Sequence, residues 1–155
     1  MKQRIYIDTS VFGGYFDPEF DMFTRPLFDR IFAEEMILLF SATTQEELFD
    51  APEEVKNLVQ KVKTKSTEYL DLNLDIIQLA NDYIAHRVVG KTSFADCLHI
   101  ATASFYHADY LVSWNFKHIV NVNRIIGYNS INIRNGYKPL EIRSPREFIN
   151  YGNEE

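Results

Sequence analysis

The sequence predicts a single α/β domain built around a mainly parallel β-sheet. Short runs rich in β-branched and aromatic residues alternate with segments whose apolar residues recur at helical spacing, which is typical of α/β folds. The length of 155 residues corresponds to about one domain. The chain contains no repeat, low-complexity segment or long Gly/Ser linker that would divide it. We therefore expect one domain over residues 1–155.

Four apolar runs are expected to form strands. The first is residues 4–7, which end at Asp8, and the second is residues 36–40. Residues 110–113 form the third, and residues 131–133 are expected to form the last strand.

The segments between these strands are expected to be helical. Apolar residues recur at intervals of three and four along residues 21–35, 74–86 and 94–106. Further helices are expected to start at Thr43, to run over residues 52–63 behind a proline, and to cover residues 145–149. Residues 9–14 end in two glycines and are expected to form a turn.

Composition excludes several classes of protein. A single cysteine, Cys97, excludes an internal disulfide and a multi-cysteine zinc site. The longest apolar run, residues 36–40, is far shorter than a membrane span, and we expect a soluble cytoplasmic protein. The net charge of −6 argues against nonspecific binding of nucleic acid by the whole surface. Residues 1–55 hold 12 acids and 4 bases, which fits either a solvated face or carboxylates gathered around a cation.

Four polar residues stand where the predicted strands end or the next helices begin. Asp8 follows the first strand, and Glu47 lies in the helix after the second. Asp96 lies in the first turn of helix 94–106, and Asn115 follows strand 110–113. Sites of α/β proteins collect at the carboxyl ends of the strands. Carboxylates brought together there repel one another unless a hard cation such as Mg²⁺ or Mn²⁺ binds them, and this arrangement suits metal-assisted phosphodiester hydrolysis.

Each of these residues also has a structural interpretation. Asp8 can cap the segment that follows it, and Asp96 stands three residues after Ser93, in capping-box register. Glu46 stands in the same register with Thr43, and Glu47 with Thr44, so the choice between the two glutamates is open. Asn115 can be a turn residue.

The motifs around these residues resemble those of the PIN-domain nucleases. Residues 5–11 (IYIDTSV) resemble the opening motif of that family, and Glu47 resembles its second acidic position. Residues 95–103 (ADCLHIATA) are similar to the third motif and are the most specific segment. Residues 108–116 (ADYLVSWNF) resemble the fourth. The four motifs occur in the order of the family and span residues 4–118.

The resemblance implies a three-layer PIN-like domain. Its twisted, mainly parallel sheet would have about four or five strands in the order 3-2-1-4-5, flanked by helices, with residues 121–155 as a C-terminal extension. The implied activity is Mg²⁺- or Mn²⁺-dependent hydrolysis of single-stranded RNA. Many small members are VapC-like toxins of type II toxin–antitoxin pairs and dimerise, which implies an antitoxin protein and a second copy as partners.

The resemblance also implies roles for individual residues. Asp8, Glu47 and Asp96 would bind the metal, and Asn115 would complete the catalytic set. Many members carry Asp where this chain has Asn115, which leaves one ion and two ions as alternatives. Thr9 or Ser10 would add a hydroxyl beside the first Asp and contact the substrate.

Basic residues that could contact phosphate lie on both sides of the last two motifs. Lys117 and His118 follow Asn115 closely, and we expect them to bind substrate. Arg87 and Lys91 precede the third motif and Arg124 follows the fourth, whereas the lysine-rich run 56–65 is typical of a solvated helix face. His99, three residues after Asp96, is either a neighbour of the site or a satisfied helix histidine, and Cys97 is expected in the core.

Two other enzyme classes do not fit the sequence. A haloacid-dehalogenase-like phosphatase needs a second acid two residues after the first, where this chain has Ser10. A phosphate-binding P-loop is absent from the sequence. The alternative from another class is a non-catalytic PIN-like module that binds RNA or protein, which the neutral Asn115 and the net acidity favour.

Overall fold

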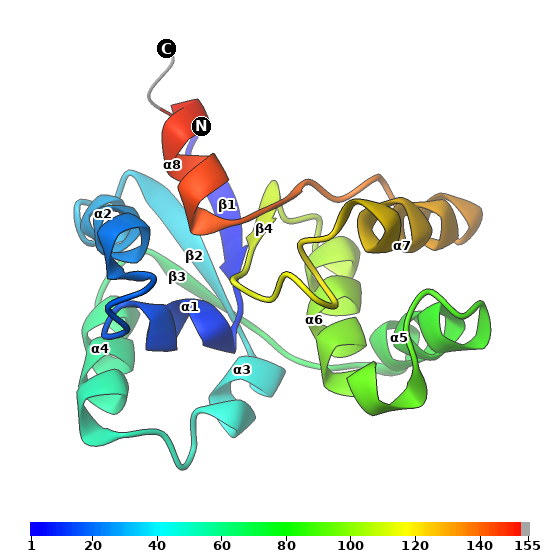
Figure 1. Ribbon diagram of the computed structural model, residues 1–155, viewed down its shortest axis with the longest axis horizontal. Coiled ribbons are helices and arrows are strands. Elements are labelled where there is room, and N and C mark those ends of the chain that lie inside the picture. The colour runs from blue at the N-terminus through cyan, green and yellow to red at the C-terminus, as the bar shows by residue number, and fades with distance from the viewer. Residues whose placement is uncertain (153–155) are drawn as a thin grey trace.

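Five parallel strands in the order β3-β2-β1-β4-β5 form the centre of the molecule (Figure 1). The computed structural model describes residues 1–152. The strands are β1 (Gln3–Ile7), β2 (Met36–Ser41), β3 (Thr67–Leu70), β4 (Tyr110–Val112) and β5 (Ile142–Arg143). All four strand pairs run parallel. The parallel sheet and its order 3-2-1-4-5 are therefore confirmed.

Helices cover both faces of this sheet, which gives three layers (Figure 1). One face is covered by α1 (Thr9–Gly14), α2 (Asp21–Phe32), α4 (Glu53–Lys63) and α8 (Pro145–Gly152). The other face is covered by α5 (Leu74–Ala85), α6 (Phe94–Phe105) and α7 (Val122–Arg134). The short helix α3 (Ala42–Glu47) follows β2, and the 3-10 turn η1 (Lys91–Ser93) leads into α6.

Side chains of the strands alternate between two hydrophobic cores. Ile5 and Ile7 of β1 pack into the core under α1, α2 and α4, whereas Tyr6 packs into the core under α5, α6 and α7. This is the period of two expected for strands buried on both faces. It explains why the β1 and β2 segments read as unbroken apolar runs in the sequence.

Residues 9–14 form the helix α1, and the predicted turn is wrong. Val11, Phe12 and Gly14 are buried in this helix. A side chain at Gly14 would meet the indole of Trp114, since a Cβ there would lie 2.8 Å from its Nε1. Gly14 is therefore required by close packing rather than by a turn.

Residues 131–133 lie inside the helix α7, so the predicted strand is also wrong. Asn121 caps this helix by accepting hydrogen bonds from the backbone N–H groups of Asn123 and Arg124. The buried residues Tyr128, Ile131 and Asn132 then follow at helical spacing. The sheet instead ends with β5, whose two residues carry no recognisable pattern, and β3 is a half-exposed edge strand.

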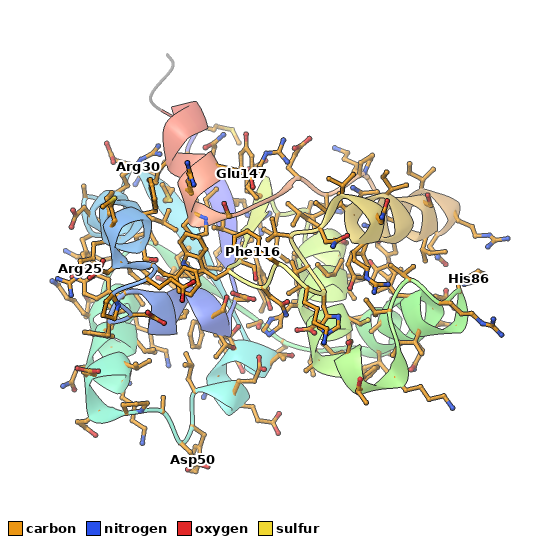
Figure 2. All side chains as sticks on the ribbon, in the orientation of Figure 1. Arg25, Arg30, Asp50, His86, Phe116 and Glu147 are labelled. Atoms are coloured by element: carbon orange, nitrogen blue, oxygen red, sulfur yellow. The ribbon has the colours of Figure 1, made fainter. Side chains whose placement is uncertain are left out.

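None of the helices within residues 1–152 combines the length and the apolarity that are needed to cross a lipid bilayer. The one cysteine, Cys97, is buried in the core, as expected. Trp114 is also largely buried, where it donates a hydrogen bond from Nε1 to Thr24 Oγ1 at 2.8 Å. Phe116, labelled in Figure 2, is half-exposed beside it.

Candidate active site

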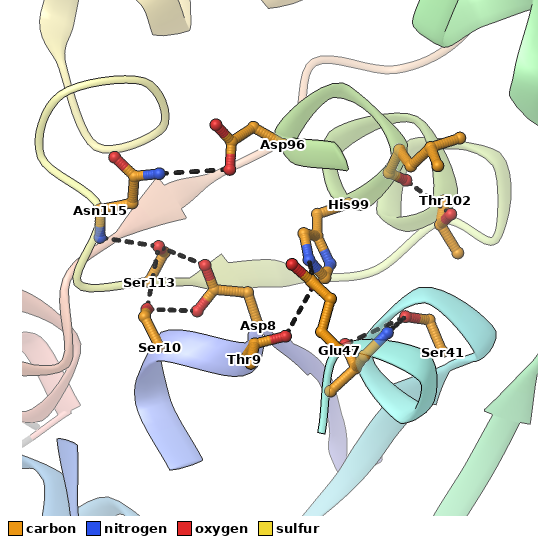
Figure 3. Close-up of polar contacts among 12 residues, drawn as sticks. Asp8, Thr9, Ser10, Ser41, Glu47, Asp96, His99, Thr102, Ser113 and Asn115 are labelled. Atoms are coloured by element: carbon orange, nitrogen blue, oxygen red, sulfur yellow. Dashed lines mark hydrogen bonds and ion pairs between the residues drawn. The ribbon is translucent and has the colours of Figure 1, made fainter. Parts of the chain in front are cut away.

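Asp8 lies at the carboxyl edge of the sheet, directly after β1, and only 4% of it is exposed. Two hydroxyls donate to its carboxylate, Ser10 to Oδ1 and Ser113 to Oδ2, each at 2.6 Å (Figure 3). Each hydroxyl also accepts a backbone N–H, from Trp114 and from Asn115 respectively. These backbone donors direct the hydroxyl protons toward Asp8. Asp8 therefore ties the end of β1 to the end of β4.

Glu47 reaches the same edge from α3, which follows β2. Its Oε1 accepts hydrogen bonds from Thr9 Oγ1 at 2.8 Å and from His99 Nε2 at 2.5 Å. Burial works to raise the pKa of Glu47, but these two hydrogen bonds and the charge of His99 together lower it below its ordinary value. Glu47 is thus held in its ionised form and in one orientation.

A buried chain of hydrogen bonds supports Glu47 from behind. His99 Nδ1 lies 2.6 Å from the Tyr6 hydroxyl, which lies 2.7 Å from Ser41 Oγ. Burial raises the pKa of Tyr6, so the phenol keeps its proton. His99 Nε2 faces the Glu47 carboxylate and Nδ1 faces the Tyr6 hydroxyl, so both ring nitrogens have a hydrogen-bond partner. His99 is therefore both a satisfied core histidine and a direct neighbour of the site.

Asp96 and Asn115 meet at the same edge from α6 and from the loop after β4. Asn115 Nδ2 donates to Asp96 Oδ1 at 3.2 Å. Asn115 Oδ1 accepts the backbone N–H groups of Lys117 and His118, at 3.2 and 2.9 Å. Because a backbone N–H only donates, these two contacts fix which end of the amide faces Asp96. Asn115 is thus a turn residue that also positions Asp96.

The three carboxylates influence one another electrostatically. Burial raises the pKa of Asp8 above its ordinary value, and the charge of Glu47 raises it further. The charge of His99 and the hydrogen bonds from Ser10 and Ser113 lower this pKa but do not cancel the increase. Burial likewise raises the pKa of Asp96, and the charges of Asp8 and Glu47 add to the increase, whereas His99 and His118 oppose it. The structure therefore gathers negative charge at one place.

The donor chemistry of this set fits a hard divalent cation, because Mg²⁺ and Mn²⁺ prefer oxygen ligands and would relieve the repulsion. As the side chains lie, no group of three or more His, Cys, Asp or Glu residues within 1–152 converges on a common metal position. Each carboxylate instead accepts hydrogen bonds from its neighbours. An ion shared by all three would require at least one of them to turn.

The structural interpretations of these acids fail at the helix termini. Asp8 and Ser93 occupy N-cap positions, but neither side chain makes a capping hydrogen bond. Helix α3 begins at Ala42 and is capped by Ser41, so it starts one residue before Thr43. Both Glu46 and Glu47 are exposed, but Glu47 accepts hydrogen bonds from Thr9 and His99. Glu47 is therefore the glutamate that belongs to the site.

The residues expected to bind substrate lie around this set. The hydroxyls of Thr9 and Ser10 donate to Glu47 and Asp8. Lys117 is exposed, and the charge of His118 acts on Asp96, which lies close to it. Among the described residues, His118 Nδ1 is a buried atom without a hydrogen-bond partner. Contact of these four residues with substrate stays a prediction.

Sequence reasoning missed three parts of the site. It did not assign Ser113 to Asp8, Tyr6 to His99, or His99 to Glu47. One available signal was the serine that ends the strand 110–113, two residues before Asn115. Tyr6 gave no signal, because a tyrosine within a buried strand reads as core.

By sequence, no protein-family model and no curated protein matches the chain. By structure, the chain is similar to a chain in the crystal structure of VapBC2 from Rickettsia felis bound to a DNA fragment from their promoter. The TM-score is 0.55 at 12% identity, and the match covers 92% of this chain and 98% of that chain. The chain has a PIN-like fold.

The PIN-like fold accounts for the place of the site. Parallel strands put their carboxyl ends at one edge, and in the order 3-2-1-4-5 the crossover direction changes beside β1. Asp8 follows β1 itself, while the other site residues come from elements after β2, before β4 and after β4. The PIN-like fold thus brings together residues that are up to 107 positions apart, from Asp8 to Asn115.

Proposed function

We propose that this protein is a metal-dependent endoribonuclease that hydrolyses single-stranded RNA and is the toxin of a type II toxin–antitoxin pair. The observation that carries the nuclease proposal is the position of Asp8, Glu47 and Asp96 at the carboxyl edge of a PIN-like sheet, each held by hydrogen bonds from neighbouring side chains. The toxin proposal, with an antitoxin as partner, rests on the structural likeness to VapBC2. A second copy as partner rests only on the resemblance of the motifs to the PIN-domain family.

In this proposal, Asp8, Glu47 and Asp96 hold one or two Mg²⁺ or Mn²⁺ ions. A bound ion would supply a Lewis acid for a phosphate oxygen and would lower the pKa of an attacking water. Cys97 is not suited to act as a nucleophile, because burial raises the pKa of its thiol to about 12. No side-chain nucleophile is part of this proposal.

The protein's own groups would prepare the carboxylates for this task. Ser10 and Ser113 orient Asp8, while Thr9 and His99 orient Glu47 in its ionised form. Asn115 donates to Asp96 and so restrains it without adding a fourth negative charge. Because the fold fixes these donors, reorganisation would be limited to the carboxylate that has to turn toward a shared ion.

A Mn²⁺ titration tests the metal ligands, and the chain offers a matched control in two adjacent glutamates. Replacing Glu47 by Gln is expected to weaken Mn²⁺ binding at least about tenfold, as loss of groups that hold a metal does. Replacing the exposed neighbour Glu46 by Gln changes the net charge equally and is expected to leave the affinity unchanged. The measurement is calorimetry on the full chain.

Two outcomes of the titration would contradict the proposal. Equal Mn²⁺ affinity in both glutamate variants would remove Glu47 from the site. A wild-type protein that binds no Mn²⁺ would favour the non-catalytic module. The observation on the side of that module is that no three His, Cys, Asp or Glu side chains within residues 1–152 converge on one metal position.

A further inference from the structure

The structure assembles a positively charged pocket from residues that are far apart in the sequence. Arg87 and Lys91 come from the segment between α5 and α6, and Arg124 comes from the first turn of α7. The pocket has a volume of about 460 Å³, within the range of about 300–1,000 Å³ found for ligand sites. Its other lining residues carry no charge.

The three positive charges are not neutralised by acids. Among the described residues, none of the three cations forms an ion pair. Arg124 donates from Nη1 to the backbone carbonyl of Val88, which orients the guanidinium but leaves its charge. In a chain of net charge −6, a pocket with three cations and no carboxylate is a local exception. An anionic ligand is therefore the chemistry that it fits.

Packing holds the walls of this pocket together. Gly127 of α7 lies so close to Val88 that a Cβ at position 127 would be 2.8 Å from Val88 Cγ1. The segment after α5 is closed by hydrogen bonds from Arg87 N to Ile84 O and from Val88 N to Tyr83 O, the pattern of a Schellman motif. The two walls of the pocket are thus held by packing and by backbone hydrogen bonds.

Two segments of the chain connect the pocket with the carboxylate site. Lys91 begins the 3-10 turn that leads into α6, five residues before Asp96. Arg124 lies one helical turn before Tyr128, whose hydroxyl donates to the backbone carbonyl of His118 at 2.7 Å. Burial raises the pKa of Tyr128, and Cys97 raises it further. The charge of Asp96 also raises this pKa, whereas the charge of Arg124 lowers it. Both charges therefore lie near the same hydroxyl.

We infer that Arg87, Lys91 and Arg124 form a binding site for backbone phosphates of single-stranded RNA that extends beyond the carboxylates. This inference rests on the proposed function and adds to it a path for the substrate, from the edge of the sheet toward α5 and α7. In the sequence, Lys117 and His118 lie between Asn115 of the carboxylate site and Arg124 of the pocket. An RNA that reaches both sites would extend from the carboxylates to the three cations.

The test measures RNA affinity apart from cleavage. A fluorescein-labelled single-stranded oligoribonucleotide is titrated with the full chain in EDTA, and binding is followed by anisotropy. The variants are Lys91→Gln, Arg87→Gly and their combination. Arg87 has a φ of 59°, the left-handed conformation that glycine adopts most readily, so Arg87→Gly is expected to preserve the fold. An unchanged or higher Tm checks this.

The control matched to the single variant Lys91→Gln is Lys56→Gln, which removes one positive charge from α4. The control position lies away from the pocket. In Figure 2, His86, the neighbour of Arg87, is well separated from Asp50, which lies just before α4. We expect the double variant to bind RNA about tenfold more weakly and Lys56→Gln to bind as the wild type does. Each lost phosphate contact is also expected to reduce the slope of log K against log salt by about 0.7.

Equal RNA affinity in the double variant and the wild type would overturn the inference, and this is also the result expected if the pocket takes an acidic segment of a protein partner. An equal loss in Lys56→Gln would overturn it as well, because the effect would then be one of net charge. Cleavage by the wild type with Mn²⁺ is measured separately. If cleavage fails, the proposed function fails, while the affinities still decide whether the pocket binds RNA.

Discussion

The Asp8→Asn variant is expected to lose RNA cleavage by about 10³-fold or more while its fold becomes no less stable. Loss of one preorganised electrostatic group at a reaction centre costs about 10²–10³ in rate, and Asp8 is in addition a proposed metal ligand. Its ionised carboxylate is buried, which raises its pKa and destabilises the folded state at neutral pH. An amide of the same shape removes that cost. Its Nδ2 would donate to one of the two serine hydroxyls, whose oxygen has a second lone pair beside the one that accepts the backbone N–H.

The pH dependence of stability gives a second readout of the same residue. Because the pKa of Asp8 in the folded state lies above its ordinary value of 3.8, protonation favours folding as the pH falls toward that value. We therefore expect Asp8→Asn to be more stable than the wild type at pH 7, and the difference to shrink on acidification. Each kcal/mol gained raises the Tm by about 2–4 °C.

Asp29→Asn, at an exposed position of α2, is the matched control for the change of charge. It is expected to change neither cleavage nor the pH profile of Tm. A Tm of Asp8→Asn well below that of the wild type would show that Asp8 is kept for stability. Cleavage at the wild-type rate would remove it from the site.

Asn132→Ala is expected to destabilise the protein by about 3 kcal/mol, the largest effect on folding that we foresee. Asn132 is fully buried in α7, accepts a hydrogen bond from the Tyr83 hydroxyl and donates to Ser104 Oγ at 3.0 Å. The alanine leaves two buried hydroxyls without this partner and creates a cavity. Thermal unfolding is expected to show a Tm lower by about 10 °C.

Asn123→Ala, at an exposed position of the same helix, controls for the change in helix propensity. It is expected to change stability by less than about 0.5 kcal/mol. Adding Tyr83→Phe to Asn132→Ala is expected to recover part of the loss, because one stranded hydroxyl is then removed. An Asn132→Ala variant with the same Tm as Asn123→Ala would contradict the buried hydrogen-bond network between α5, α6 and α7.

The buried strands and amphipathic helices could be predicted from the sequence because packing dominates them. Residues 4–7 and 36–40 are apolar on both faces, and both form strands of the sheet. Residues 131–133 have the β-branched composition of a strand, yet the Asn121 cap and the burial of Tyr128 put them in a helix. Local propensity was overridden there by tertiary packing.

The gathering of Asp8, Glu47, Asp96 and Asn115 could be predicted, because acids and amides at strand ends of a parallel sheet must meet at one edge. The partners that orient them could not. Ser113 and His99 are recognisable only once β1, β4 and α6 are placed side by side. The same holds for Arg87 and Arg124, whose separation of 37 residues hides a shared pocket.

The most direct test of the central claim is the cleavage of a labelled single-stranded RNA with Mn²⁺, with EDTA, and by the Asp96→Asn variant with Mn²⁺. We predict cleavage by the wild type with Mn²⁺ only, and a loss of about 10³-fold in the variant at unchanged Tm. Cleavage that persists in EDTA or in Asp96→Asn would contradict a metal-dependent nuclease built on these carboxylates.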